Sequence, residues 1–136
     1  MKKLYSVIIL LFISCFLFAG EIKKELVYEK TFDTAPSIQT ARQWSSKTFF
    51  NSEKSYNEES KVITGFGFIP ESDFFVNYNF DYKISITGNT VKILFNNFTV
   101  GTAKQPFKEG TMYIKYLDNF YEDLKKTSES LFKYCE

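Results

Sequence analysis

Residues 76–100, VNYNFDYKISITGNTVKILFNNFTV, alternate polar and apolar side chains over almost their whole length. A period of two residues is typical of a sheet that has one face toward water and one face toward a core. Gly88-Asn89 divides the stretch and suits the two-residue turn of a hairpin. The stretch therefore predicts a long antiparallel hairpin, which restricts the chain to folds whose sheet is covered on one side.

This turn also predicts a register. If Thr87 lies opposite Thr90, three apolar pairs meet on one face, namely Ile86–Val91, Ile84–Ile93 and Tyr82–Phe95. The pattern then fails, because Asn97 would lie opposite Phe80. One extra residue at Asn96-Asn97 restores it and brings Phe98 to Phe80 and Val100 to Tyr78. We therefore expect a β-bulge at this point.

The segments on either side of the hairpin predict further strands and helices. They are a strand over 25–32, a helix over 36–49 with Asp33 or Thr34 as its cap, a short strand around Lys54, a strand over 61–69 and a helix over 112–134. We expect an α+β domain over residues 21–136 in the order β-α-β-β-β-β-α. It has an antiparallel sheet of about five strands, with both helices packed on one face.

Two predictions about the core bear on where a binding surface can lie. Trp44 lies in the predicted helix beside Ile38 and Ala41, so we expect its ring in the core rather than on a sugar-stacking surface. In the strand 61–69, alternation separates Val62, Thr64, Phe66 and Phe68 from Ile63, Gly65, Gly67 and Ile69. We place Ile63 and Ile69 on the polar side of the sheet.

Residues 1–20 have the order of a secretory signal peptide. Lys2 and Lys3 precede an apolar run that ends in Ala19-Gly20, and the run is short for a membrane span. We expect cleavage after Ala19 or Gly20 and a periplasmic or secreted chain. Ile13-Ser14-Cys15 also faintly resembles a lipobox, so a lipoprotein anchored through Cys15 stays open.

Removal of residues 1–20 leaves 15 basic and 16 acidic side chains and a net charge of −1. A nearly neutral chain has little electrostatic attraction to nucleic acid or to an anionic membrane. Cys135 becomes the only thiol, which excludes an internal disulfide and leaves an unpaired cysteine or a bond between chains. The core must then depend on burial of its 13 Phe, 8 Tyr and one Trp.

The strand at 26–32, Gln43-Trp44 in a helix, the segment Thr64-Gly65-Phe66-Gly67 and the long hairpin together resemble a bacterial family. It is the domain of unknown function numbered 4468, which has a TBP-like fold, and the likeness spans residues 24–134. The resemblance implies a fold like one half of the TATA-binding protein and an envelope or secreted setting. It implies no activity. Asn77 and Asn79 on the polar face suit minor-groove contacts, but the export signal and the charge argue against nucleic acid.

No histidine occurs in the chain, which excludes imidazole base catalysis and metal sites that use histidine. We expect no cofactor and no metal. Glu58-Glu59 and Glu71-Ser-Asp73 are the nearest approach to paired carboxylates, but both lie in predicted turns where solvated charge is usual. Glu71 and Asp73 also lack the ligand number that calcium prefers. Gly65-Phe-Gly67 lacks the Lys-Ser/Thr of a phosphate loop and suits close packing.

The polar face of the hairpin is the main candidate binding surface. Its side chains are Asn77, Asn79, Asp81, Lys83, Lys92, Leu94 and Asn96. The loop residues Phe74 and Phe75 form a second candidate. A solvated face without function is the alternative for both.

Three functions are open at this point. The first is a non-enzymatic binding or assembly module of the cell envelope, acting on a protein, peptide or glycan through its sheet face or a strand edge. The second is a hydrolytic enzyme with carboxylates in an unseen cleft. The third is an inhibitor or immunity-like partner of another exported protein.

Overall fold

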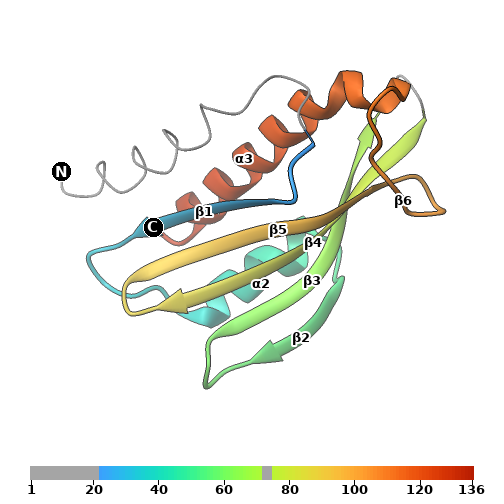
Figure 1. Cartoon of the computed structure of the whole chain (residues 1–136). Helices are drawn as coiled ribbons and strands as arrows, with labels where there is room; N and C mark the ends of the chain where they lie inside the picture. Colours follow the sequence, from blue (N-terminus) through green and yellow to red (C-terminus); the bar gives the residue numbers. More distant parts are fainter. Residues whose placement is uncertain (1–21, 72–74) are drawn as a thin grey trace.

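The computed structural model describes residues 22–71 and 75–136; the predicted signal peptide and Phe74 lie outside them. In this described part, six strands form one antiparallel sheet in the order β1-β5-β4-β3-β2, with β6 paired to β5. Both helices cover the same face of that sheet (Figure 1). The elements are β1 (Glu25–Thr31), α2 (Ile38–Thr48), β2 (Glu53–Asn57), β3 (Val62–Glu71), β4 (Val76–Thr87), β5 (Thr90–Val100), β6 (Gln105–Pro106), a 3-10 turn (Met112–Tyr116) and α3 (Leu117–Tyr134). The predicted α+β fold with helices on one face is confirmed.

The β4–β5 hairpin has the predicted register. Thr87 lies opposite Thr90, and the apolar pairs follow as expected, namely Ile86–Val91, Ile84–Ile93 and Tyr82–Phe95. The register shifts between Asn79 and Asp81, where Asn97 adopts a φ of 53° as the extra residue. The predicted bulge is therefore confirmed, and Val100 lies opposite Tyr78 beyond it.

The prediction for the faces of β3 was wrong. Ile63 is fully buried and Ile69 packs against the core, whereas Phe66 and Phe68 lie on the open face with 46% and 45% exposure. The reason is the pairing with β4, which sets Gly65 opposite Tyr82 and Gly67 opposite Phe80. A Cβ atom on Gly65 would lie 2.5 Å from the Tyr82 hydroxyl oxygen, so only glycine leaves room for that ring.

Helix α2 begins later than predicted. Its N-cap is Ser37, whose hydroxyl accepts a hydrogen bond from the Gln39 amide at 3.1 Å, rather than Asp33 or Thr34. Pro36 precedes this cap. Trp44 lies in the core as predicted, with 3% of its surface exposed, and its indole N–H donates to the Ser130 hydroxyl of α3 at 3.1 Å.

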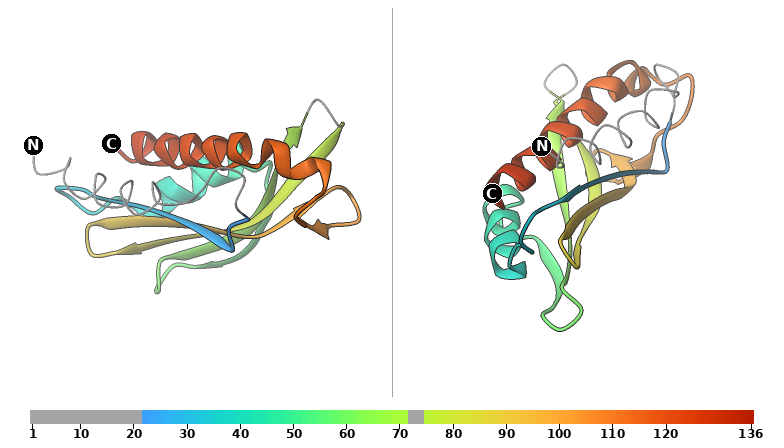
Figure 2. Two further views of the ribbon diagram at one scale, coloured as in Figure 1. Left: turned by 45° about the horizontal axis from the view of Figure 1, so that its top comes forward. Right: turned by 90° about the vertical axis from the view of Figure 1, so that its left-hand side faces the viewer.

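The C-terminal helix is shorter than predicted because residues 112–116 form a 3-10 turn. From Leu117 the helix lies along the sheet beside α2 (Figure 2). It buries one stripe against the strands, namely Leu117, Phe120, Tyr121, Leu124, Ser128, Leu131 and Phe132. Strand β6 lies between the hairpin and the C-terminal helix, where no strand was predicted.

Aromatic rings connect the layers. Phe49, directly after α2, stacks on Tyr82 with centroids 4.3 Å apart and meets Trp44 edge-on at 5.3 Å. Phe120 of α3 lies 6.3 Å from Phe80 of β4. Phe49 also lies 5.7 Å from Phe80, so the ring of Phe80 contacts an aromatic residue from each helical segment.

Replacing the tryptophan tests this core. Trp44→Ala should lower the free energy of unfolding by about 3 to 5 kcal/mol, because it removes a buried ring and leaves a cavity. Lys83→Ala is the matched control, since Lys83 is exposed on the opposite face, and it should have almost no effect. Urea unfolding of both variants measures the difference; a neutral Trp44→Ala would contradict the core position.

Replacing a glycine tests the packing of β3 on β4. In Gly67→Ala the new Cβ would lie 2.6 Å from Phe80 Cζ and 3.0 Å from Phe49 Cδ1. We expect a loss of about 1 to 3 kcal/mol in the free energy of unfolding. Phe80→Leu removes the atom that clashes, so the double variant should lose less than the sum of the two single variants. Additive losses would show that the ring does not meet Gly67.

Candidate functional site

The predicted polar residues lie together on the face of the sheet that the helices leave open. The pairing aligns Lys83 with Leu94, Asp81 with Asn96, and Ser85 with Lys92 across β4 and β5. On the other side of β4, Phe66 lies beside Asp81 and Phe68 beside Asn79. The set Asn77, Asn79, Asp81, Lys83, Lys92, Leu94 and Asn96 is half-buried or exposed throughout.

Two of these polar residues already hold other parts of the chain. Asn79 donates from its amide nitrogen to the Thr99 hydroxyl at 3.2 Å and to the Gly101 carbonyl at 2.9 Å. Asp81 accepts from Asn97 Nδ2 at 2.8 Å and from Lys54 Nζ at 3.2 Å. These bonds fix the β-bulge and the edge strand, so Asn79 and Asp81 have a structural role in the face.

Three phenylalanines that the sequence analysis did not single out gather at one end of this face. Phe50, Phe66 and Phe68, which we call the aromatic cluster, are 77%, 46% and 45% exposed. The rings of Phe50 and Phe68 lie nearly parallel, with centroids 6.4 Å apart. Beside them is a hollow of about 190 Å³, lined by Thr48, Phe49, Phe50, Asn51, Ser52, Phe66, Gly67 and Phe68. Large apolar side chains grouped on a surface are typical of interaction sites.

The sequence contained a signal for this cluster. Gly65 and Gly67 alternate with Phe66 and Phe68, and glycines in a strand mark a close approach of other atoms. If Tyr82 and Phe80 lie over these glycines, then Phe66 and Phe68 must lie on the open face, because alternate residues of a strand point to opposite faces.

The predicted loop site is only partly described. Phe75 is 95% exposed, with a φ of 53° in the left-handed region, and it directly precedes β4. Its predicted companion Phe74 lies outside the described residues. Phe75 is therefore an exposed apolar side chain at the end of the sheet that β3 and β4 share.

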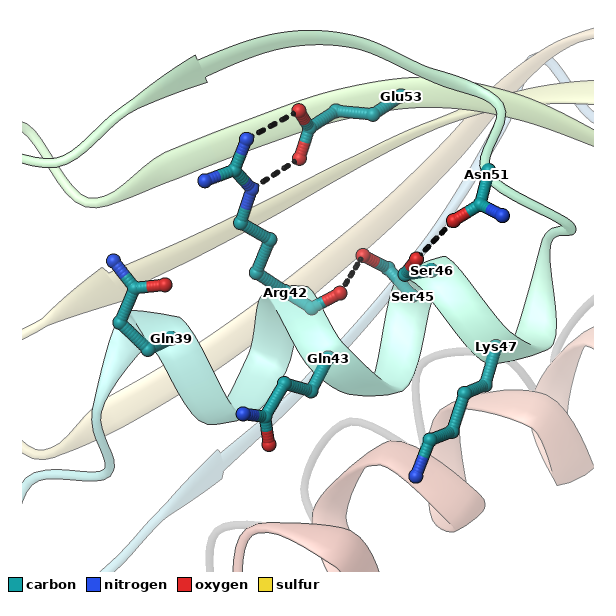
Figure 3. A pocket seen from close by; sticks show the side chains of 8 residues that line it. All are labelled: Gln39, Arg42, Gln43, Ser45, Ser46, Lys47, Asn51 and Glu53. Atoms are coloured by element: carbon teal, nitrogen blue, oxygen red, sulfur yellow. Dashed lines mark hydrogen bonds and ion pairs between the residues drawn. The ribbon is translucent and has the colours of Figure 1, made fainter.

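A polar hollow of about 570 Å³ lies between α2 and the β2 strand (Figure 3). Its walls are Gln39, Arg42, Gln43, Ser45, Ser46, Lys47, Asn51 and Glu53. Arg42 donates from Nε and Nη2 to both carboxylate oxygens of Glu53, at 2.9 Å and 3.0 Å. This pair joins the helix to the edge strand across the hollow.

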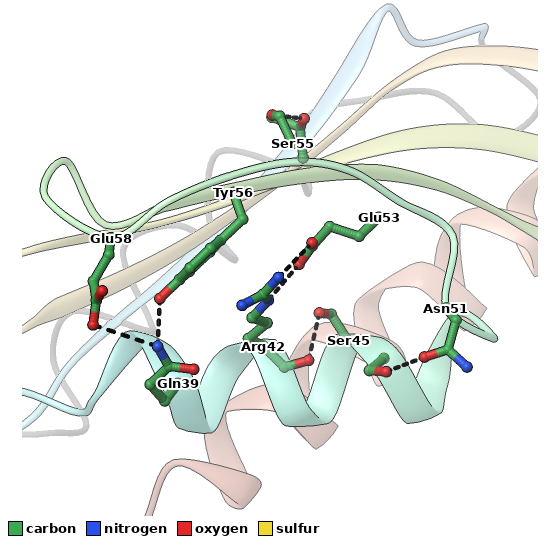
Figure 4. A network of polar contacts seen from close by, with 10 residues as sticks. Gln39, Arg42, Ser45, Asn51, Glu53, Ser55, Tyr56 and Glu58 are labelled. Carbon is green, nitrogen blue, oxygen red and sulfur yellow. Dashed lines mark hydrogen bonds and ion pairs between the residues drawn. The ribbon is translucent and has the colours of Figure 1, made fainter.

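The surrounding network uses most of the polar groups of the hollow internally (Figure 4). Gln39 donates to the Tyr56 hydroxyl, Ser46 donates to Asn51, and the Arg42 guanidinium lies 3.8 Å from the centre of the Tyr56 ring. The hydrogen bond to Glu53 is the main cause that raises the pKa of Arg42. Because its guanidinium group is already paired with the Glu53 carboxylate, Arg42 is not available to bind another anion.

Burial lowers the acidity of three groups that could serve as nucleophiles or proton donors. Desolvation is the main cause that raises the pKa of Tyr28 and of Tyr78 to about 12. Burial also raises the pKa of the free thiol of Cys135 to about 11. A thiol that stays protonated at neutral pH is a poor nucleophile.

The carboxylates considered from the sequence do not converge on one point in the described residues. Glu58 Oε1 lies 3.5 Å from Gln39 Nε2 on the exposed side of β2. Glu71 lines a different polar hollow with Glu122 and Asp123, while Asp73 is outside the described part. Within residues 22–71 and 75–136, no three His, Cys, Asp or Glu side chains group as metal ligands. Among the helices of these residues, none is long and apolar enough to cross a membrane.

No protein-family model and no curated protein sequence matches this chain. Solved structures do resemble it. The crystal structure of a TBP-like protein from Parabacteroides distasonis ATCC 8503 has a TM-score of 0.62 and 9% identity, covering 87% of this chain and 97% of its own. A DUF4468 family protein from Bacteroides ovatus ATCC 8483 has a TM-score of 0.57 and 12% identity, covering 88% of this chain and 94% of its own. At these identities the likeness establishes the fold, and the chain shares the TBP-like α+β architecture of both proteins.

Proposed function

We propose that this chain is a non-enzymatic binding module of the bacterial cell envelope that holds a partner at the aromatic end of its open sheet face. The observation that carries the proposal is the aromatic cluster, in which Phe50, Phe66 and Phe68 surround a hollow with nearly half or more of each side chain exposed. Full burial of an exposed phenylalanine contributes about 1.5 to 3 kcal/mol, and Phe66 and Phe68 would gain roughly half of this because about half of each is already buried. Three such side chains in one contact supply a useful part of a binding energy.

The polar part of the face complements this end. Lys83 and Lys92 are exposed, whereas Asn79 and Asp81 are held by their own hydrogen bonds. A polar rim beside an apolar centre is the usual composition of a protein interface. A partner protein, including a target that this chain inhibits, fits this arrangement.

The hydrolytic alternative has less support. The Arg42–Glu53 pair occupies the larger polar hollow, and the carboxylates of Glu122 and Asp123 are exposed. General acid catalysis by a carboxyl group requires a raised pKa, for which a desolvated site is the common cause. The absence of histidine from the sequence removes the most frequent general base.

The envelope location rests on residues 1–20. We expect the chain recovered from the envelope fraction to begin at Gly20 or Glu21, because a signal peptidase cleaves after small residues. N-terminal sequencing and intact mass measure this directly. A start at Cys15 with an added lipid mass would favour the lipoprotein alternative, and an uncleaved chain in the cytosol would contradict export.

Capture from envelope extract tests the binding surface. The processed protein should retain a partner that the double variant Phe66→Ala, Phe68→Ala binds at least about tenfold more weakly, since about 1.4 kcal/mol changes affinity tenfold. Lys83→Ala with Lys92→Ala is the matched control on the same face and should retain the partner. Loss only in the lysine variant would move the site to the polar part of the face. Equal capture by all three, or by none, would contradict the proposal.

A further inference from the structure

The aromatic cluster lies where the sheet has an open edge. Strand β2 pairs with β3 only from Val62 to Gly65, and the Phe66 amide then donates to the Ser52 carbonyl at 3.3 Å. Strand β3 continues past the end of β2 to Glu71 (Figure 1). Among the described residues, the stretch from Gly67 to Pro70 is paired with β4 alone.

The hydrogen-bonding groups of this edge can be assigned from the pairing. In an antiparallel ladder the N–H and C=O of one residue point to the same side, and the side alternates along the strand. Phe66 donates toward β2, so the N–H and C=O of Phe68 point to the open side as well. Pro70 adds a carbonyl there but no N–H. The edge therefore offers one donor and two acceptors to an additional strand.

The hollow of the aromatic cluster lies beside this edge. Its walls come from Asn51 and Ser52 just before β2, from Phe66 to Phe68 of β3, and from the turn after α2 that carries Phe49 and Phe50. Its volume is about 190 Å³. An apolar cavity of roughly 150 Å³ is large enough to bind benzene. A strand added at Phe68 would therefore have room there for one large apolar side chain.

The charges around Phe66 favour acidic residues next to that side chain. Lys54 Nζ lies 5.7 Å and Lys104 Nζ lies 6.0 Å from the centre of the Phe66 ring. Lys54 is shared with Asp81, while no carboxylate of the described part lies within ion-pair distance of Lys104. Positive groups beside an apolar hollow attract a negatively charged partner.

We propose that the free edge of β3 binds an extended acidic peptide of another protein, which adds a short strand beside Phe68 and places one large apolar side chain in the hollow. This inference rests on the proposed function and specifies its partner. Main-chain bonds from the edge and a pocket for one side chain are the two elements of recognition by strand addition. A second copy of this chain fits less well: an antiparallel Phe68–Phe68 pair would set Pro70 of one copy opposite Phe66 of the other, where Ser52 already lies.

A fluorescent heptapeptide, Glu-Val-Glu-Phe-Glu-Val-Glu, is the probe, and anisotropy measures its binding to the processed protein. We expect saturable binding that weakens at least tenfold when the central Phe is replaced by Ala, or when the Glu residues are replaced by Lys. N-methylation of the central Phe and of alternate residues keeps the side chains but blocks strand pairing, and should weaken binding to a similar extent. On the protein, Phe68→Ala should weaken binding tenfold, whereas Lys133→Ala, an exposed position on α3, should not.

Amide exchange reports the strand itself. In the free protein the Phe68 amide should exchange faster than the amides of Gly67 and Ile69, which face β4. Saturating peptide should slow exchange at Phe68 at least tenfold and leave Gly67 unchanged.

Three results would overturn the inference. Equal affinity for the N-methylated peptide would mean an apolar contact without strand pairing, which leaves the proposed function intact. The heptapeptide could fail to bind at about 1 mM, which is the limit of weak binding. If partner capture still depended on Phe66 and Phe68, the partner would be of a different kind. The chain could form a dimer that Phe68→Ala dissociates and that the peptide does not dissociate. This result would mean that the edge binds a second copy of the chain.

Discussion

The structure depends on the contact between two glycines of β3 and two aromatic rings of β4. Tyr82 lies over Gly65 and Phe80 lies over Gly67, in space that any Cβ atom would occupy. Phe49 stacks on Tyr82 and contacts Phe80 at 5.7 Å, which fixes the end of α2 on the sheet. The same contact has a second consequence. Because alternate residues of a strand point to opposite faces, glycines toward the helices require that Phe66 and Phe68 face solvent.

The open face is consequently divided between two kinds of surface. At its centre, Asp81 bonds to Asn97 in the β-bulge and to Lys54 on the edge strand. Here the polar side chains stabilise an irregular ladder, and a partner would have to displace those bonds. At the other end, the exposed side chains of Phe66 and Phe68 are apolar, so a partner that covers them displaces water and breaks no hydrogen bond made by those side chains. The difference in what must be given up explains why the aromatic end is the better candidate.

The hairpin could be predicted from the sequence because two independent signals agree there. Period-two alternation fixes the buried face, the Gly88-Asn89 turn fixes the register, and a one-residue slip would invert every side chain. Strand β3 lacks such agreement, since large apolar or glycine residues stand at most of its positions on both faces. Its orientation follows only from long-range contact with Tyr82 and Phe80. The start of α2 at Ser37 and the 3-10 turn before α3 are likewise set by packing and local bonds rather than by periodicity.

An open strand edge is a hazard, because it is a template for uncontrolled pairing with other chains. Here the unpaired edge is short and both of its ends are restricted, which limits pairing with other chains. Ser52 closes one end through its bond with Phe66, and Pro70 withholds a donor near the other, so the free groups are those of Phe68 and one carbonyl. A long strand cannot enter this space, whereas a few residues of an extended peptide can. The features that protect the chain from aggregation thus also set the size of the partner segment that the edge can accept.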